Sequence, residues 1–396
     1  MHMDVAAAAA KTRTGGFGQS SNSEAAAAGR ESVRMALAGS EPQAGDLVII
    51  FPSAAYDLEA LHAAALEEAG PASVVGCTTV GAFTDSAQLQ FGCVAAHIPG
   101  DDISFGVCHL ERDDEDIMGS ARRAAETARQ RGGEQYPHSV LMLLCDGLTP
   151  DQRAMARGAF EVTSAIIPMV GGAAGDDLHW QATYTFGEGK VLSNGFACVW
   201  INSARPMAVS VDHGWRPFGK PMLVTRAEGP VIFELDGIPA LDAYLSERGA
   251  ALKEDARSFG EKCMERPVGL PNAHGRYDLR QVHQTVPNGG IVLTTSVPEQ
   301  TVVQVMAGDE DSLLEGARRA AESALTQLPE APRMVLVFSC CTRTPLLKER
   351  VAEEVDLISG TLGGAPAGGF YTCGELARVT GSTGIHNSSV AILALS

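Results

Sequence analysis

One segment of six residues occurs twice in the chain, 196 positions apart, and this repeat constrains the fold more than any other feature. Residues 121–126 read Ala-Arg-Arg-Ala-Ala-Glu, and residues 317–322 repeat that order letter for letter. An acidic cluster precedes each copy, as the N-terminus of a helix favours. An apolar run follows each copy and leads to Cys145 in the first and to Cys341 in the second. The sequence therefore predicts an internal duplication in which each copy supplies a helix and then a buried strand.

A third and weaker copy begins near residue 47. Residues 47–51 have the pattern of a buried strand, residues 58–69 that of a helix, and residues 73–75 that of a second strand. In all three units the second strand runs into a glycine-rich turn, at residues 76–81, 171–176 and 368–375. Each turn is followed by a further strand, at residues 91–98, 196–201 and 388–395. Right-handed crossovers between parallel strands then predict an α/β fold, with mixed sheets built from repeated strand–helix–strand units.

The remaining segments suggest how the chain is divided. Residues 1–30 are rich in alanine, serine and glycine, and we expect a disordered tail without the features of a secretory signal. Two domains follow, over residues 31–235 and 236–396. The second is expected to contain a helix over residues 240–248 and an irregular excursion over residues 264–290, which are rich in Pro, Gly, Asn and His.

Charge and cysteine usage exclude several classes of function. Lysine and arginine number 30 against 48 aspartate and glutamate, so the formal net charge is −18. This charge argues against nucleic acid or an anionic membrane as partner, because both favour basic surfaces. No apolar run approaches the roughly 20 residues of a membrane span. The nine cysteines form no Cys-x-x-Cys pair, which indicates buried, reduced thiols and a cytoplasmic protein.

The three glycine-rich turns are the candidate binding sites, because sheets of this kind bind ligands at the carboxyl ends of their strands. The same glycines are equally compatible with tight turns and close backbone packing. The third turn favours function, since Tyr371, Cys373 and Glu375 bring three polar groups together. Asp176 would be related to Glu375 by the duplication, and Arg343 is a candidate partner for Glu375 or for a ligand carboxylate. The predicted binding residues are Gly76, Cys77, Thr78, Gly172, Asp176, Cys340, Arg343, Phe370, Tyr371, Cys373 and Glu375.

The histidines show none of the spacings typical of metal sites. His386 and His213 stand out by their positions beside predicted strands, although a hydrogen-bonded structural histidine fits the same pattern. The sequence contains no serine-hydrolase elbow, and its residues do not assemble the chemistry of a particular reaction. The sequence therefore favours a binding protein over an enzyme.

In their order and spacing, these segments resemble the FIST domain family of sensory proteins, which have an N-terminal and a C-terminal part. The resemblance rests on residues 75–83, 146–147, 170–177, 214–219, 224–225, 234–240 with Tyr244, 297–298, 338–340 with Arg343, 369–375 and 386–387. It implies FIST N and FIST C domains, and a ligand sensor that acts on a separate partner in bacterial signal transduction.

Within the family, the stand-alone NosP-like proteins are the most similar; they bind haem, sense nitric oxide and regulate a histidine kinase. A haem b site here would take His386 or His213 as axial ligand. Its walls and propionate partners would come from Trp215, Arg216, Phe218, Arg343, Phe370 and Tyr371. Two alternatives stay open: a FIST sensor of a small polar metabolite such as an amino acid, and, more distantly, an enzyme that uses a cysteine or paired carboxylates. The expected partners are a small-molecule ligand, a histidine kinase or other signalling protein, and a second copy of the chain in a homodimer.

Overall fold

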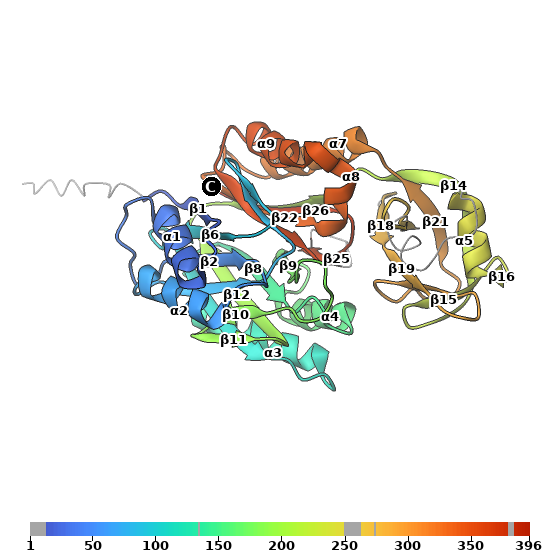
Figure 1. Ribbon diagram of the computed structural model, residues 1–396, viewed down its shortest axis with the longest axis horizontal. Coiled ribbons are helices and arrows are strands. Elements are labelled where there is room, and N and C mark those ends of the chain that lie inside the picture. The colour runs from blue at the N-terminus through green and yellow to red at the C-terminus, as the bar shows by residue number, and fades with distance from the viewer. Residues whose placement is uncertain (1–12, 134, 249–262, 273–274, 379–383) are drawn as a thin grey trace, which may run out of the picture.

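The computed structural model describes residues 13–133, 135–248, 263–272, 275–378 and 384–396. Three units of one design form the main body (Figure 1). The first contains β1 (Gly16–Ser20), α1 (Ala25–Leu37), β2 (Leu47–Pro52), α2 (Leu58–Ala69), β3 (Ser73–Cys77) and β6 (Cys93–Ile98). The second contains β7 (Ile103–Glu111), α3 (Ile117–Gly132), β8 (His138–Cys145), α4 (Gln152–Thr163), β9 (Met169–Ala173) and β12 (Gly195–Ser203). The third contains β13 (Met207–Asp212), α7 (Glu310–Leu325), β22 (Met334–Cys340), α8 (Thr344–Leu347), α9 (Val351–Thr361), β23 (Ala367–Thr372) and β26 (Val390–Leu395).

The predicted repeat is confirmed at the level of these units. In each, the two central strands pair in parallel across a helical crossover, and the last strand returns antiparallel beside them. The repeated six-residue segment lies in α3 and in α7. The acidic residues that precede each copy supply the N-caps of these helices, since Asp116 accepts from the Gly119 amide and Asp309 from the Ser312 amide. The alanines of both copies are buried against the sheets, which explains why the segment could recur unchanged.

Short hairpins exchanged between units join the three sheets. The hairpin of β4 (Ala82–Thr84) and β5 (Gln88–Leu89) leaves the first unit and pairs with β23 of the third. The hairpin of β10 (Thr185–Gly187) and β11 (Lys190–Leu192) pairs with β3. The hairpin of β24 (Glu375–Arg378) and β25 (Ile385–His386) pairs with β9. The exchange is cyclic, so each unit completes the sheet of another.

A common core lies where the inner faces of the three sheets meet. Phe51, Met142, Phe338 and Phe370 come from all three units and are fully buried there. The rings of Phe51 and Phe370 stack with centroids 4.6 Å apart. On its outer face each sheet is covered by helices, α1 and α2 on the first, α3 and α4 on the second, and α7 and α9 on the third. The body is therefore one folding unit with a single central core.

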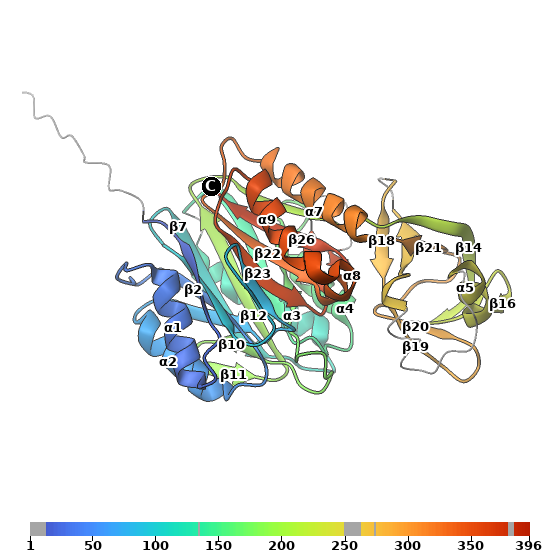
Figure 2. The same ribbon diagram turned by 45° about the horizontal axis from the view of Figure 1, so that its top comes forward.

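Between β13 and α7 the chain leaves the body and forms a second lobe, which stands to one side of it in Figures 1 and 2. Its elements are β14 (Arg216–Glu228), β15 (Val231–Leu235), β16 (Ile238–Pro239), α5 (Ala240–Arg248), β17 (Val268–Pro271), β18 (Tyr277–Arg280), β19 (Val282–Thr285), β20 (Ile291–Leu293) and β21 (Val302–Ala307). A separate core around Val224, Tyr244 and Val305 holds the lobe together.

Two expectations about the division of the chain, the disordered tail and the irregular excursion, are corrected by these elements. Of the predicted tail over residues 1–30, residues 16–20 form β1 and residues 25–30 begin α1, while residues 1–12 lie outside the described part. The expected domain boundary at residue 236 falls inside the lobe, between β15 and β16. The predicted irregular excursion contains β17, β18 and β19. In the described part of the chain, no helix combines the length and apolarity needed to span a bilayer.

Candidate functional site

The three glycine-rich turns meet at the carboxyl ends of the parallel strands, as predicted, but they bind one another. A backbone amide of each turn donates to a carbonyl of a neighbouring turn. The donor and acceptor pairs include Val80 with Tyr371 at 3.3 Å, Gly175 with Thr78 at 2.9 Å, Ala173 with Gly374 at 2.9 Å, and Cys373 with Ala173 at 3.0 Å. These N–H groups are therefore occupied by the fold and are not free to hold a ligand. Ten of the eleven predicted binding residues are buried, and Cys373 is partly exposed.

The glycines of the turns are required by packing. A Cβ atom built on Gly76 would lie 2.0 Å from the carbonyl oxygen of Ile50 on the neighbouring strand. At the matching position of the third unit, a Cβ on Gly369 would lie 1.7 Å from the oxygen of Val337. A Cβ built on Gly172 would lie 2.5 Å from Cγ2 of Thr372. Close backbone approach, the second of the two interpretations above, accounts for these glycines.

Asp176 and Glu375 do not form the expected pair of related carboxylates. Asp176 holds its own loop, because its side chain accepts from the backbone amides of Trp180 at 2.8 Å and Ala182 at 3.1 Å. Glu375 lies in β24, directly opposite Gly172 of β9. It is fully buried and accepts from the Ser389 hydroxyl at 2.8 Å. Burial raises the pKa of Glu375 well above its usual range, whereas the hydrogen bonds from Thr372 and Ser389 oppose this shift.

Arg343 is also committed to the fold. The side chain is fully buried, and its Nε donates to Glu354 at 2.8 Å. Its two terminal nitrogens donate to the carbonyl oxygens of His213 and Leu313, each at 3.0 Å. The partner of Arg343 is therefore Glu354 of α9, and neither Glu375 nor a ligand carboxylate takes that place.

The two candidate histidines form hydrogen bonds with the backbone. His213 accepts from the Trp215 amide through Nδ1 at 2.9 Å, and its Nε2 lies 3.1 Å from the Tyr277 oxygen. His386 directs Nε2 to the Ala377 oxygen at 2.8 Å. Burial lowers the pKa of both rings, to about 4 for His213. Both are therefore neutral histidines at pH 7.

The buried neutral state of His213 predicts a loss of stability in mild acid. The unfolded chain binds a proton on this ring below pH 6.5, whereas the folded chain does so only near pH 4. Stability therefore falls between these values, by roughly 3 kcal/mol for this group. We expect His213→Gln to reduce the difference between urea unfolding at pH 7 and pH 4.5. His179→Gln, at an exposed position, serves as the control and should leave that difference unchanged.

The residues expected to enclose haem are dispersed. Phe370 lies in the central core beside Phe51, whereas Phe218 lies on the lobe, where Arg266 covers its ring at 5.4 Å. Trp215 donates its indole N–H to the Ser388 oxygen at the junction of lobe and body. Within the described ranges no group of three or more His, Cys, Asp or Glu side chains is placed to hold a metal ion. The predicted haem residues therefore do not form one slot.

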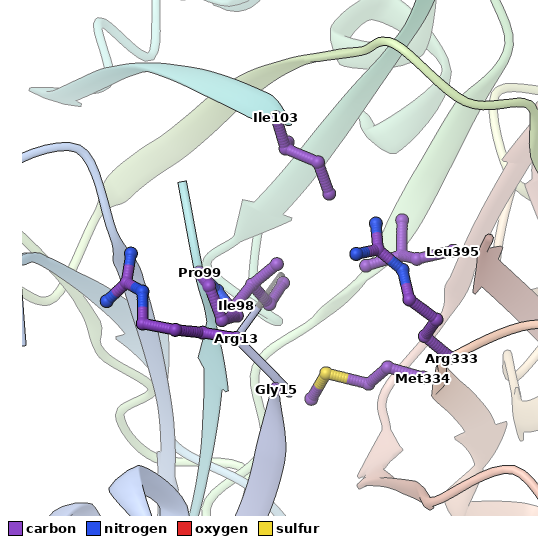
Figure 3. A pocket seen from close by; sticks show the side chains of 8 residues that line it. All are labelled: Arg13, Gly15, Ile98, Pro99, Ile103, Arg333, Met334 and Leu395. Carbon is purple, nitrogen blue, oxygen red and sulfur yellow. The ribbon is translucent and has the colours of Figure 1, made fainter. Parts of the chain in front are cut away.

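A small cavity lies at the other end of the body, where the parallel strands begin. Figure 3 shows Arg13 and Arg333 on opposite sides of it. Its volume of about 20 Å³ suits one water molecule and no metabolite. Both arginines are already paired with carboxylates, Arg13 with Asp46 and Arg333 with Asp102. This cavity is therefore not a ligand site.

A larger groove lies beside α4, and its lining includes Ser296 of the lobe. It has a volume of about 470 Å³, and its lining includes three arginines, Arg153 and Arg157 of α4 and Arg378 of β24. Arg153 reaches across to the lobe and donates to the Ser296 carbonyl at 2.9 Å and hydroxyl at 3.0 Å. Arg378 lies over the ring of Phe160 with its Cζ 3.5 Å from the centroid.

A fourth arginine is buried next to this groove. Arg280 of β18 is 3% exposed, and its Nη1 donates to the oxygen of its own neighbour, Leu279. Its Nε has no hydrogen-bond partner among the residues that the structure describes. Burial lowers the pKa of Arg280 to about 10; the charge of Asp278 opposes this shift, and the charge of Arg153 adds to it. Arg280 is thus a cation withdrawn from water and placed near a second cation.

Among the described residues, no carboxylate oxygen lies within ion-pairing distance of any of these four arginines. Two other buried arginines have such partners: Arg112 pairs with Asp146, and Arg343 pairs with Glu354. A buried cation without a counter-ion is costly unless something else neutralises it. The four side chains, Arg153, Arg157, Arg280 and Arg378, are called the arginine cluster below.

Comparison with known proteins places the chain in a family. The FIST N domain matches residues 46–238, and the FIST C domain matches residues 240–378. The chain belongs to the FIST family. FIST domains are associated with the sensing of small ligands in signalling.

The relatives that this FIST protein matches include proteins of bacteria and archaea. The uncharacterized protein Rv0628c of Mycobacterium tuberculosis (strain ATCC 25618 / H37Rv) is 26% identical over 381 residues, which cover 93% of this chain and 94% of the relative. The uncharacterized protein MJ1623 of Methanocaldococcus jannaschii is 35% identical over 202 residues, 48% of this chain and 38% of that protein. A crystal structure of cyanuric acid hydrolase from A. caulinodans aligns over 97% of this chain and 99% of that one. Its TM-score is 0.34 and its identity 10%, so the likeness carries no argument.

Polar contacts connect the lobe of this FIST protein to its body around the arginine cluster. Thr294 donates to Asn387 at 2.6 Å, and Ser388 donates to Gln281 at 3.0 Å. Contacts of this kind resemble those between domains that move relative to each other. The groove therefore lies where a ligand could contact both parts.

None of the four clustered arginines belongs to the set predicted from the sequence. A weak signal was present, because Arg153 and Arg157 are four residues apart and share one face of a helix. Arg280 lies within the stretch that was expected to be irregular, and Arg378 is distant in sequence from α4. Only the exchange of β24 onto β9 brings Arg378 to the groove.

Proposed function

We propose that this FIST protein senses a small anionic metabolite, carrying a carboxylate or phosphate group, which binds at the arginine cluster. The observation that supports this proposal is that three arginines line one groove while a fourth, Arg280, is buried near Arg153, and that none of the four forms an ion pair with a described carboxylate. Guanidinium groups bind carboxylates and phosphates through paired, charge-assisted hydrogen bonds. The metabolite alternative is retained in this form, with its site moved from the glycine-rich turns to the groove.

The position of the groove suggests how binding would become a signal. Arg153, Arg157 and Arg378 belong to the body, whereas Arg280 and Ser296 belong to the lobe. An anion held by both sets favours the arrangement in which lobe and body are close, and so shifts the population toward it. A histidine kinase or another signalling protein would read that arrangement. In this proposal the ligand is bound and released unchanged.

Removing two cations from the groove should abolish binding. For the wild-type chain we expect a thermal shift with one or more of inorganic phosphate, succinate and glutamate. For the double variant Arg153→Ala/Arg157→Ala we expect calorimetry to show a loss of affinity of about 100-fold or more. Each charge-assisted hydrogen bond contributes about 1.5–3 kcal/mol, and about 1.4 kcal/mol corresponds to a factor of ten. Arg318→Ala is the control, because Arg318 is a partly exposed arginine of α7 paired with Glu322. Unchanged affinity in the double variant would refute the site.

Haem and nitric oxide are the second ligand class, and they rest on the family resemblance alone. We include haem b in the same series and expect no stoichiometric Soret band, because the predicted wall residues are dispersed. A Soret band that shifts with nitric oxide and disappears in His386→Ala would show that the ligand is haem and not an anionic metabolite. Chemical conversion of a bound anion would instead favour an enzyme.

A further inference from the structure

Two thiols lie side by side where neighbouring strands end. β22 and β23 run parallel, with Cys340 opposite Thr372 in the last register pair. Cys341 and Cys373 directly follow these two strands in the chain, and Cys341 is the first residue of a short 3-10 helix, η1 (Cys341–Arg343). Adjacent strands are about 4.8 Å apart, which is within the Cα separation of about 4.4–6.8 Å that a disulfide requires.

The side chains of these two cysteines share one face of the sheet. Cys341 belongs to the apolar cluster beneath α9, and Cys373 packs against that same cluster. The hydrogen bond with Cys340 lowers the pKa of the Cys341 thiol, but contact with the Cys373 thiol and burial raise it well above its usual value. The two sulfur atoms are therefore adjacent, as are the backbone segments that carry them.

Access to solvent separates the roles of the two cysteines. The structure describes all nine cysteines of the chain, and eight of them are buried. Cys373 alone is partly exposed. Cysteines that respond to oxidants are accessible and have a second cysteine beside them that can complete a disulfide. Cys373 fits the first description and Cys341 the second.

We propose that a peroxide oxidises Cys373 and that Cys341 then closes a reversible disulfide between β22 and β23. In the first step the Cys373 sulfur attacks a peroxide oxygen, the O–O bond breaks, and with hydrogen peroxide one water leaves. In the second step the Cys341 sulfur attacks the sulfenic acid at Cys373, and hydroxide leaves with the thiol proton as a second water. Two thiols and one hydrogen peroxide thus give one disulfide and two waters.

The disulfide would act on a junction of the fold. The Cys373 amide donates to the Ala173 oxygen at 3.0 Å, where the third turn contacts the second. β24 begins two residues later and carries Arg378 to the groove. Oxidation would therefore fix the start of the exchanged hairpin. The disulfide itself follows from the two thiols and does not depend on what the groove binds.

The test uses the full chain, treated with hydrogen peroxide under native conditions, alkylated, digested and examined by mass spectrometry. We expect one cross-link between Cys341 and Cys373, with the loss of two hydrogens and full reversal by dithiothreitol. Cys373→Ser should abolish the cross-link, whereas Cys340→Ser should retain it. In Cys341→Ser the sulfenic acid at Cys373 should persist and react with dimedone. Cys341→Ala replaces that variant if serine destabilises the fold.

Other products would overturn the proposal. A disulfide between Cys340 and Cys341 would show that the chain-adjacent thiols react instead. Sulfinic acid at Cys373 in the wild-type chain, without a cross-link, would show that Cys341 cannot reach it. Absence of any product at Cys373, under conditions that oxidise the unfolded chain, would show that the thiol is protected.

Discussion

Replacement of Gly369 by alanine is expected to prevent the chain from folding. An added Cβ would lie 1.7 Å from the carbonyl oxygen and 2.7 Å from the carbonyl carbon of Val337. Both atoms are backbone atoms of β22, a strand with partners on both sides, so neither can move without breaking a sheet. The cost should exceed about 5 kcal/mol, the lower end of the stability of a typical protein. Soluble yield, circular dichroism and thermal unfolding measure this effect.

A glycine a few residues away provides the control. Gly360 lies in α9, and an added Cβ there would meet nothing within 4 Å. Gly360→Ala should therefore leave the fold intact and raise its stability by up to about 1 kcal/mol, as helix interiors favour alanine. If Gly369→Ala instead unfolded within a few degrees of the wild type, β22 and β23 could not be as close as described.

The second large effect is expected from Glu354→Ala. This glutamate is 2% exposed, receives the guanidinium of Arg343 and accepts from the Ser339 hydroxyl at 2.6 Å. Its removal leaves a fully buried cation without a counter-ion, which typically costs about 3–5 kcal/mol. Arg343 also holds the carbonyls of His213 and Leu313, next to the two points where the lobe leaves and rejoins the body. The connection between lobe and body should therefore loosen along with the core.

Urea unfolding measures this prediction, with the adjacent residue as a matched control. Glu353 lies in the same helix but is exposed, and its ion pair with Arg350 should contribute at most about 1 kcal/mol to stability. Glu353→Ala should therefore shift the unfolding midpoint little. The double variant Arg343→Met/Glu354→Leu should recover part of the loss, because it removes both charges together. Equal effects of Glu353→Ala and Glu354→Ala would contradict the buried pair.

Local patterns predicted the units of the body but not how they are joined. The alternation of strand and helix, and the repeated alanines of α3 and α7, follow from periodicity within one unit. The exchanged hairpins consist of strands of two to four residues, which carry little signal of their own. Their partners are distant in sequence, as Glu375 is from Gly172. The lobe was missed in part because its strands are short and interrupted by proline and glycine.

The site depended on those same distant contacts. The glycine-rich turns lie at the carboxyl ends of the strands, as the sequence predicts. Whether their N–H groups face a ligand or another turn is decided by a neighbour in space, such as Gly374 beside Ala173. The arginine cluster likewise gathers residues of α4, β18 and β24, which no local pattern connects. Arg343 shows the converse, since a charged residue beside a promising motif is bonded within the fold.

The cyclic exchange of hairpins also sets the order in which the protein can mature during its synthesis. The hairpin at Ala82 can pair only after β23 has been synthesised, and β9 can pair with β24 only after β24 has been synthesised. Both β23 and β24 emerge late from the ribosome. At the usual rates of elongation this delay is on the order of tens of seconds. Throughout it, the nascent chain presents open sheet edges, which are prone to pairing with other chains. A cell that makes this protein must therefore shield its early two-thirds, and chaperone demand during translation is part of the cost of closing the ring.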